Sequence, residues 1–358
     1  MDAVACVGRG KTNDKLFTYE ILEDIMEVRT AASSRYYPVD IADVMQWLST
    51  QGPDKRYAVI GLPCTLKALH LAMLHIPILR RRVVFLLGLV CSHLPNRYYT
   101  EYLARLSGIT PDRLSTVDYR LKGDVRAGNY YFQARTHNRT EGRRVPFLGK
   151  VSCAWTRGYF QYNACTYCDD VFAEVADAVF MDAWLPEYET DPKGHSLVIL
   201  RHPELKQILV RGSQDNTCCL GPISIDKVVA SQKASVYRKK MQIAGRLYRA
   251  QRRGDWFPGK RVAPSEAILH THHREIEALY AVQRISKESW LELRQAPLWR
   301  FHLRMLRADW PLRAGLWRGR LRRVVANPWL LLRLLLLPLR QFPKKSTQER
   351  TLVNSKKE

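Results

Sequence analysis

Continuous hydrophobic runs and helical periodicities alternate along the first part of the chain. The runs at residues 57–64 and 82–91 are rich in Val, Ile and Leu, which is typical of parallel strands buried on both faces. Apolar residues at helical spacing follow each run, through about residue 75 and over residues 95–106. This order predicts two strand–helix units whose strand ends meet at one sheet edge, where open α/β sheets bind ligands.

Further hydrophobic runs predict three more strands, at residues 2–8, 175–183 and 196–201. Residues 117–135 alternate in hydrophobicity, as antiparallel strands do. We therefore expect a mixed α/β (α+β) fold with a mixed sheet as its core, followed by a basic helical C-terminal region.

Three more helices are predicted outside these strands. Residues 20–28 have helical character, and Asp40 can cap a helix that ends near residue 49. Residues 203–211 predict another helix after the last strand.

Charge divides the chain into two parts. Residues 1–230 hold 28 basic and 25 acidic residues, a net charge of +3, whereas residues 231–358 hold 29 and 9, a net charge of +20. After residue 230 the composition also changes to helix formers, arginine and tryptophan. We therefore expect two domains, 1–230 and 231–358, and the second should attract phosphate groups or an acidic protein face.

The cysteines indicate a metal centre. The chain has eight cysteines and no secretory signal at its start, so a reducing cytoplasm is expected and thiols or metal ligands are favoured over disulfides. Cys165 and Cys168 form a CxxC pair, and Cys64 and Cys91 end the two predicted strands. Three interpretations stay open from spacing alone: an iron–sulfur cluster, a zinc site, or two buried thiols beside a lone CxxC.

Seven short motifs occur in one order over about residues 2–215. In chain order they are GLPC at 61–64, GLVC at 88–91, YRLK at 119–122, CTYCD at 165–169, AEVAD at 173–177, DAW at 182–184 and GHSLVILR at 194–201. Together they resemble the coenzyme F-420 hydrogenase/dehydrogenase beta-subunit family. The resemblance implies an iron–sulfur flavoprotein oxidoreductase with a 4Fe-4S cluster, whose implied ligands are Cys64, Cys91, Cys165 and Cys168.

The same resemblance implies FAD, which can pass electrons singly to a cluster and in pairs to a carrier. The implied flavin or carrier contacts lie in a polar loop and on one strand, at Ser34, Arg35, Tyr36, Tyr119, Arg120 and Lys122. Alternation places Arg120 and Lys122 on one strand face, where they can meet phosphate or the acidic tail of F-420. An ordinary surface loop and a solvated strand face are the alternatives. No catalytic residue is predicted.

One departure from the family pattern changes this picture. The chain lacks the glycine-containing stretch expected before the first strand, so we expect an N-terminal truncation and an incomplete flavin pocket. Cys153, Cys218 and Cys219 are expected to be bystanders. His270 and His273 share one helical face, but a solvated basic face is favoured there over a zinc site.

The C-terminal region predicts contact with a membrane surface. Residues 299–323 mix Trp, Leu and Arg at helical spacing, and a Leu-rich run follows at residues 329–339. That run reaches about half of a ~30 Å hydrocarbon core and contains Arg333, so an interfacial helix on an anionic leaflet is favoured over a membrane span. Packing on the globular part is the alternative, and nucleic-acid binding is disfavoured.

The expected function is electron transfer in the cytoplasm, with peripheral contact at the inner face of the membrane. The chain would relay electrons between a soluble carrier, reduced coenzyme F-420 or ferredoxin, and an unknown substrate or partner subunit. Some bacterial relatives of this kind are associated with cell-envelope polysaccharide metabolism. The alternative is a non-catalytic scaffold or partner subunit with a structural four-cysteine cluster or zinc site and a membrane-binding tail.

Overall fold

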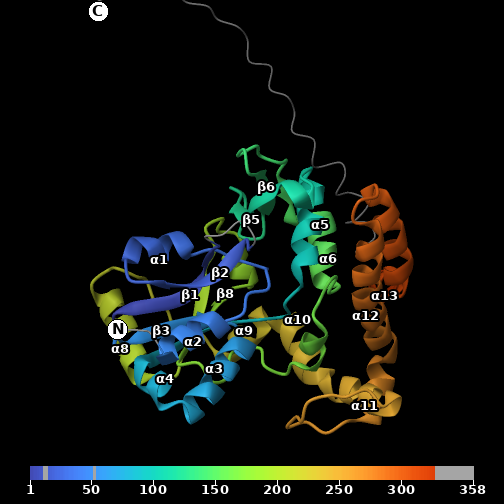
Figure 1. Ribbon diagram of the computed structural model, residues 1–358. Coiled ribbons are helices and arrows are strands. Elements are labelled where there is room, and N and C mark those ends of the chain that lie inside the picture. Colours follow the sequence, from blue (N-terminus) through green and yellow to red (C-terminus); the bar gives the residue numbers. More distant parts are fainter. Residues whose placement is uncertain (11–14, 51–53, 327–358) are drawn as a thin grey trace, which may run out of the picture. The chain divides into compact units, whose positions relative to one another are not determined.

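A six-stranded mixed sheet forms the core of the fold (Figure 1). The computed structural model describes residues 1–10, 15–50 and 54–326. The sheet has the order β2-β1-β3-β4-β8-β9, with four parallel strands in the middle and an antiparallel strand at each edge. The strands are β1 (Ala3–Arg9), β2 (Phe17–Leu22), β3 (Tyr57–Gly61), β4 (Val83–Leu89), β8 (Ala178–Asp182) and β9 (Ser196–Leu200). The predicted mixed α/β class and its mixed sheet are confirmed.

Two helices, α3 (Pro63–His75) and α4 (Pro77–Arg82), pack on the parallel strands, and α2 (Ala42–Thr50) packs on α4 and on the edge strand β2. Their apolar faces share one core with the sheet, in which Leu48 and Leu66 are fully buried. Asp40 accepts a hydrogen bond from the backbone N–H of residue 42, as the cap prediction requires.

A second, antiparallel sheet consists of β5 (Leu114–Lys122), β6 (Tyr130–Thr136) and β7 (Val145–Pro146). Helix α5 (Arg97–Ser107) packs on β6. Its N-cap is Asn96, whose side chain accepts from the N–H of residue 98. The alternation predicted for residues 117–135 is confirmed by this sheet.

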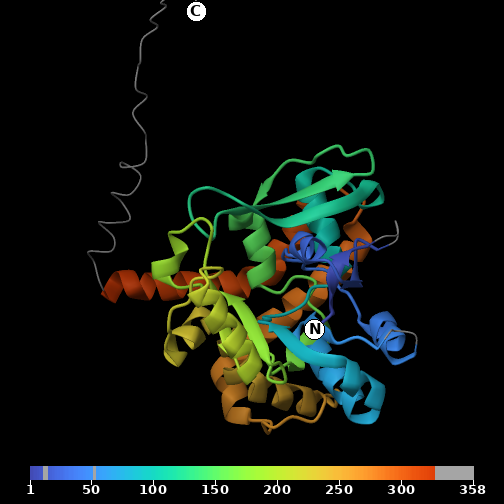
Figure 2. The same cartoon turned by 90° about the vertical axis from the view of Figure 1, so that its left-hand side faces the viewer.

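The helices after residue 230 begin within the same compact unit as the sheets. Contacts group Met1–Asp309 into one compact unit and Trp310–Glu358 into a second. In the first unit, α11 (Ile243–Arg253) and α12 (Glu266–Leu293) pack together, and they lie side by side in both ribbon views (Figures 1 and 2). The assignment of two domains divided near residue 230 stays a prediction.

The remaining elements are mostly short connections. They are α1 (Ile25–Ala31), η1 (Pro111–Arg113), η2 (Phe147–Val151), α6 (Ser152–Thr156), η3 (Asn163–Tyr167), α7 (Pro186–Glu189), α8 (Pro203–Gln214), α9 (Ile225–Ser231), α10 (Lys233–Val236), the π-helical turn η4 (Tyr237–Met241) and α13 (Leu298–Ala326).

The helix predicted at residues 20–28 is wrong in its first part. Residues 17–22 form β2, because the edge of β1 offers backbone groups that an antiparallel partner can pair. Helix α1 begins only after Asp24, whose carboxylate accepts from the N–H of Met26 at 2.6 Å.

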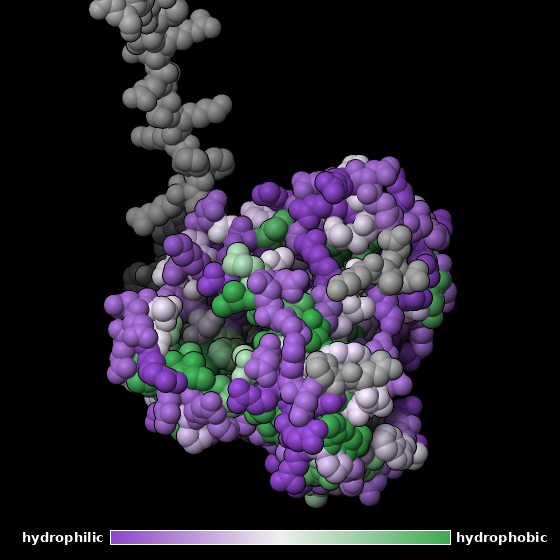
Figure 3. Space-filling view, turned by 60° about the vertical axis from the view of Figure 1, so that its left-hand side comes forward, coloured by the Kyte–Doolittle hydropathy of each residue, from purple (hydrophilic) through white to green (hydrophobic). Residues whose placement is uncertain are grey.

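No helix in the described part of the chain is long and apolar enough to cross a membrane. The Leu-rich run at residues 329–339 lies outside the described residues. Figure 3 shows a largely hydrophilic face on which apolar side chains gather in a hollow.

Candidate functional site

The CxxC loop is tied to the segment that follows β4. Cys165 lies in the turn η3, and the N–H of Cys168 donates to the carbonyl of Cys165 at 3.3 Å. The N–H of Tyr162 donates to the carbonyl of Leu94 at 3.1 Å, and the N–H of Leu94 donates to the sulfur of Cys165 at 3.4 Å. A backbone amide that faces a sulfur stabilises a thiolate or a metal-bound thiolate.

The two other cysteines lie at the same edge of the large sheet. Cys91 follows β4, and its N–H donates to the carbonyl of Val171, just beyond the CxxC loop, at 3.2 Å. Cys64 is exposed and lies in the first turn of α3, directly after β3. Cys64 and Cys91 therefore follow the carboxyl ends of two strands that pair in parallel, β3 and β4.

The pKa of Cys91 responds to the other three thiols. Burial is the main cause that raises the pKa of Cys91, Lys239 opposes it, and the charges of Cys165, Cys64 and Cys168 add to it, which gives a pKa of about 12. The pKa of Cys165 is also raised, chiefly by burial. Such thiols ionise at neutral pH only when a metal or a cation compensates the charge.

Lys239 supplies such a cation, and sequence reasoning missed it. Its side chain is 3% exposed, and Nζ donates to the sulfur of Cys168 at 3.2 Å and to the carbonyl of Asp170 at 2.8 Å. Burial alone would lower the pKa of Lys239, but the charges of Cys91 and Cys168 raise it. The lysine therefore stays charged beside the thiols.

Acidic residues after the CxxC pair are structural anchors. Asp170 is 1% exposed, forms an ion pair with Lys67 at 3.1 Å and accepts from the N–H of Glu174 at 3.1 Å. Asp169 pairs with Lys260 at 3.3 Å. These contacts join the CxxC loop to α3 and to the segment before α12.

The family motifs AEVAD and GHSLVILR hold the same loop in place. The guanidinium of Arg201 donates to the carbonyls of Phe172, Ala173 and Ala176 at 2.8–3.1 Å. A Cβ at Gly88 would lie 2.5 Å from the Cβ of Ala173, so only glycine allows this loop to approach β4.

The six residues implied as flavin contacts are not brought together as one site. Four of them cluster: Arg120 donates to Ser34 at 3.3 Å, and the rings of Tyr36 and Tyr119 lie 5.4 Å apart. The guanidinium of Arg120, however, forms an ion pair with Asp182 at 2.8 Å.

The other two implied contacts point elsewhere. Arg35 donates to the carbonyl of Val7 in β1, and Lys122 donates to the carbonyl of Lys193. Arg120 is occupied by a carboxylate and Arg35 by a backbone carbonyl, so these residues do not form a ready phosphate site.

One aromatic side chain connects this cluster with the cysteines. The ring of Trp155 lies 4.4 Å from that of Tyr36 and 4.3 Å from that of His93, centroid to centroid. His93 follows Cys91 by two residues, and its pKa is lowered to about 3 by burial and then by Arg238 and Lys239. It is therefore neutral at pH 7.

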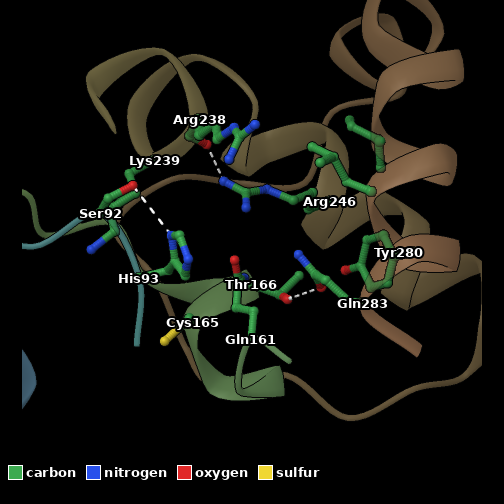
Figure 4. A pocket seen from close by; sticks show the side chains of 12 residues that line it. Ser92, His93, Gln161, Cys165, Thr166, Arg238, Lys239, Arg246, Tyr280 and Gln283 are labelled. Carbon is green, nitrogen blue, oxygen red and sulfur yellow. Dashed lines mark hydrogen bonds between the residues drawn. The ribbon is translucent and has the colours of Figure 1, made fainter. Parts of the chain in front are cut away.

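A small polar cavity lies behind Cys165 (Figure 4). Its volume is about 20 Å³, far too small for a flavin. Its lining combines the cysteine loop with helices η4, α11 and α12 and comprises Ser92, His93, Gln161, Cys165, Thr166, Arg238, Lys239, Arg246, Ile276, Leu279, Tyr280 and Gln283.

The remaining candidates lie apart from the four cysteines. The thiol of Cys153 approaches Asp309 at 4.0 Å, and that of Cys218 approaches the carbonyl of Leu209 at 3.7 Å. Within the described residues, no group of three or more His, Cys, Asp or Glu side chains is placed to hold a metal ion. The four thiols thus lie near one another without the geometry of a closed single-ion site.

Comparison with known proteins finds a family that part of this chain resembles. Residues 54–225, slightly less than half of the chain, match the family described as the C terminus of the beta subunit of Coenzyme F420 hydrogenase/dehydrogenase. The matched part holds all four cysteines and is similar to subunits of redox enzymes.

One solved structure is similar to this chain over most of its length. It is a chain of the F420-reducing NiFe hydrogenase complex from Methanosarcina barkeri, studied as a xenon derivative, with 17% sequence identity and a TM-score of 0.48. The match covers 67% of this chain and 77% of that chain. No curated protein matches the sequence.

Proposed function

We propose that this chain is an electron-transfer subunit that holds a 4Fe-4S cluster. Its proposed ligands are Cys64, Cys91, Cys165 and Cys168. The observation that carries the proposal is the convergence of these four thiols at one sheet edge, with Lys239 and the Leu94 amide directed at their sulfurs.

The positions of the four cysteines along the chain favour a cluster over zinc. A structural zinc site in a small module usually gathers two close cysteine pairs. Here the proposed ligands are scattered over roughly a hundred residues and are brought together by a folded sheet. A cluster fills a larger space between its ligands, and when bound it supplies one-electron transfer.

The chain's own residues have clear tasks in this proposal. Lys239 compensates thiolate charge, the Leu94 amide orients the sulfur of Cys165, and Arg201 fixes the loop after the CxxC pair. The carrier that we propose is reduced coenzyme F420 or ferredoxin, with an unassigned substrate or partner subunit as the other end of the relay. An envelope-polysaccharide substrate is one candidate.

Anaerobic purification tests the cluster proposal. We expect about four iron and four sulfide per chain, and a visible absorption band that bleaches on reduction. Cys165→Ser and Cys168→Ser should lose the iron, whereas Cys218→Ser is the matched control and should keep it. Stoichiometric zinc in place of iron would refute the redox role.

Flavin content is a separate measurement on the same sample. Stoichiometric FAD would support the flavoprotein prediction made from the resemblance. Iron without flavin would instead favour a one-electron relay or scaffold subunit that meets its flavin on a partner.

We also propose that α13 contacts an anionic membrane surface. Trp299, Leu303 and Leu306 recur at helical spacing and are exposed, and arginines flank them at positions 300, 304 and 307. Apolar side chains beside arginines suit the boundary between lipid tails and anionic headgroups.

A further inference from the structure

The cavity behind Cys165 has an unusual charge for a buried space. Three cationic side chains reach it, Arg238, Lys239 and Arg246, and no carboxylate of the described residues lines it. Its volume of about 20 Å³ exceeds the roughly 10–15 Å³ that one water molecule needs. The cavity can therefore hold water or a small ion.

Two buried polar atoms at this cavity lack partners. Nε of Arg246 and Nε2 of His93 have no hydrogen-bond partner among the described residues, and these side chains are 8% and 6% exposed. Figure 4 shows the guanidinium of Arg246 and the imidazole of His93 facing the same space. Nε of Arg246 is a charged donor, and Nε2 of His93 is a donor in the tautomer that carries its proton there. A buried charged donor without a partner is costly, so an acceptor in the cavity would relieve that cost at Arg246.

The nearby carboxylate does not supply that acceptor. Glu275 acts electrostatically on Arg238 and Arg246, but it accepts hydrogen bonds from Tyr237 and Gln242. Arg246 itself donates through Nη2 to the carbonyl of Arg238. The guanidinium groups of Arg238 and Arg246 therefore lack a direct ion-pair partner among the described residues.

The cations come from outside the part of the chain that matches the family. The match ends at residue 225, whereas the three cations lie on η4 and α11. Ser92, His93 and Cys165 come from inside the matched region. The cavity thus lies between the part of the chain that matches the family and the helices that follow it.

We propose that this cavity binds a small inorganic anion, a halide or a small oxyanion, between Arg238, Arg246 and His93. Thr166 and Gln283, which hydrogen-bond to each other at 3.3 Å, offer further polar groups at the cavity wall. An anion here lies next to Cys165, so its charge would oppose further negative charge on the thiols. Binding is independent of whether the four cysteines hold a cluster.

Anion titration at constant ionic strength tests the site. Bromide and sulfate are added to the full-length protein, whose iron content is measured separately, and the midpoint of thermal unfolding is followed. We expect a saturable rise, because a ligand that binds only the folded state stabilises it. A rise that never saturates, or no rise, would overturn the proposal.

Variants connect the effect to the cavity. Arg246→Gln should weaken the anion by about tenfold or more, because it removes a charged donor. Arg246→Lys should retain part of the binding. The matched control is Arg249→Gln on the next turn of α11, which pairs with Glu277 and does not line the cavity. Equal losses in Arg246→Gln and Arg249→Gln would refute the assignment.

Diffraction from wild-type crystals grown with bromide tests the proposed anion site without any variant. We expect an anomalous peak between Arg238, Arg246 and His93. Ordered water alone at this position, or bromide only elsewhere on the molecule, would contradict the proposal even if a variant fails to fold.

Discussion

Lys239 donates a hydrogen bond from Nζ to the sulfur of Cys168 over 3.2 Å, although 71 residues separate them. The bond places a buried positive charge at one of the four proposed ligands. Removing it should make reduction of a bound cluster harder, because reduction adds a negative charge. A charge-assisted hydrogen bond is worth about 1.5–3 kcal/mol, so the reduction potential in Lys239→Met should fall by about 60 mV or more.

Redox titration followed by electron paramagnetic resonance measures that shift. The matched control is Lys240→Met. Lys240 is the neighbouring lysine in the sequence, is exposed and forms an ion pair with Glu174. An unchanged potential in Lys239→Met with full iron content would show that the lysine has only a structural role.

Gly88→Ala should destabilise the protein. The new Cβ would lie 2.5 Å from the Cβ of Ala173 and 3.0 Å from that of Ala176, so the loop after the CxxC pair must move. Overpacking of this kind costs about 1–3 kcal/mol in the free energy of unfolding.

Urea unfolding of the purified protein measures this cost. Gly259→Ala provides the control, since a Cβ at Gly259 meets nothing within 4 Å. If both alanine variants unfold at the same urea concentration, the approach of the loop after the CxxC pair to β4 does not require glycine at residue 88.

Glu174 should make stability depend on acid pH. Burial raises its pKa, but Lys240 and Arg261 lower it more, so the folded-state pKa lies below the ordinary value of 4.5. A depressed pKa contributes stability that is present above the unfolded-state pKa and is lost as pH falls through the folded-state pKa.

The difference in unfolding free energy between wild type and Glu174→Gln should therefore be largest above about pH 5 and shrink below about pH 4.5. Unfolding curves at about pH 3.5 and about pH 7 measure it. Glu187→Gln, at an exposed ion pair with Lys227, should change stability little at pH 7. A Glu174 effect that grows toward acid pH would contradict the assigned direction.

The exposed face of α13 should control vesicle binding. Leu303→Glu/Leu306→Glu replaces two apolar side chains of this face with anionic ones, and affinity for vesicles rich in phosphatidylglycerol should fall about tenfold or more. Cosedimentation measures the bound fraction. Leu291→Glu changes an exposed leucine on α12 and should leave binding unchanged. If Leu303→Glu/Leu306→Glu binds the vesicles as tightly as wild type does, α13 does not contact the membrane.

The sequence predicts the sheet edge better than its surroundings. Cys64 and Cys91 follow continuous apolar runs, and the ends of neighbouring parallel strands must meet at one edge, so their approach to each other can be foreseen. Lys239 cannot be foreseen in this way, because it lies in a basic run that reads as a solvated tail. Only the folded position of η4 distinguishes it from Arg238 and Lys240.

Local patterns also misplace some side chains. Ser34, Arg35 and Tyr36 are consecutive and read as one binding loop, but Arg35 turns to the carbonyl of Val7 while its neighbours meet Arg120 and Trp155. Burial of each side chain depends on β1 and β5, which the loop sequence does not specify. The sequence also lacks any signal for the cavity, since its lining comes from separate segments of the chain.

The exposure of Cys64 has a consequence for chemical reactivity. Its thiol faces solvent, whereas those of Cys91, Cys165 and Cys168 are partly screened by protein. An alkylating reagent should therefore reach Cys64 more readily than the other three thiols. Its modification would remove one of the four proposed ligands, so this single residue sets how easily the site is damaged from solvent.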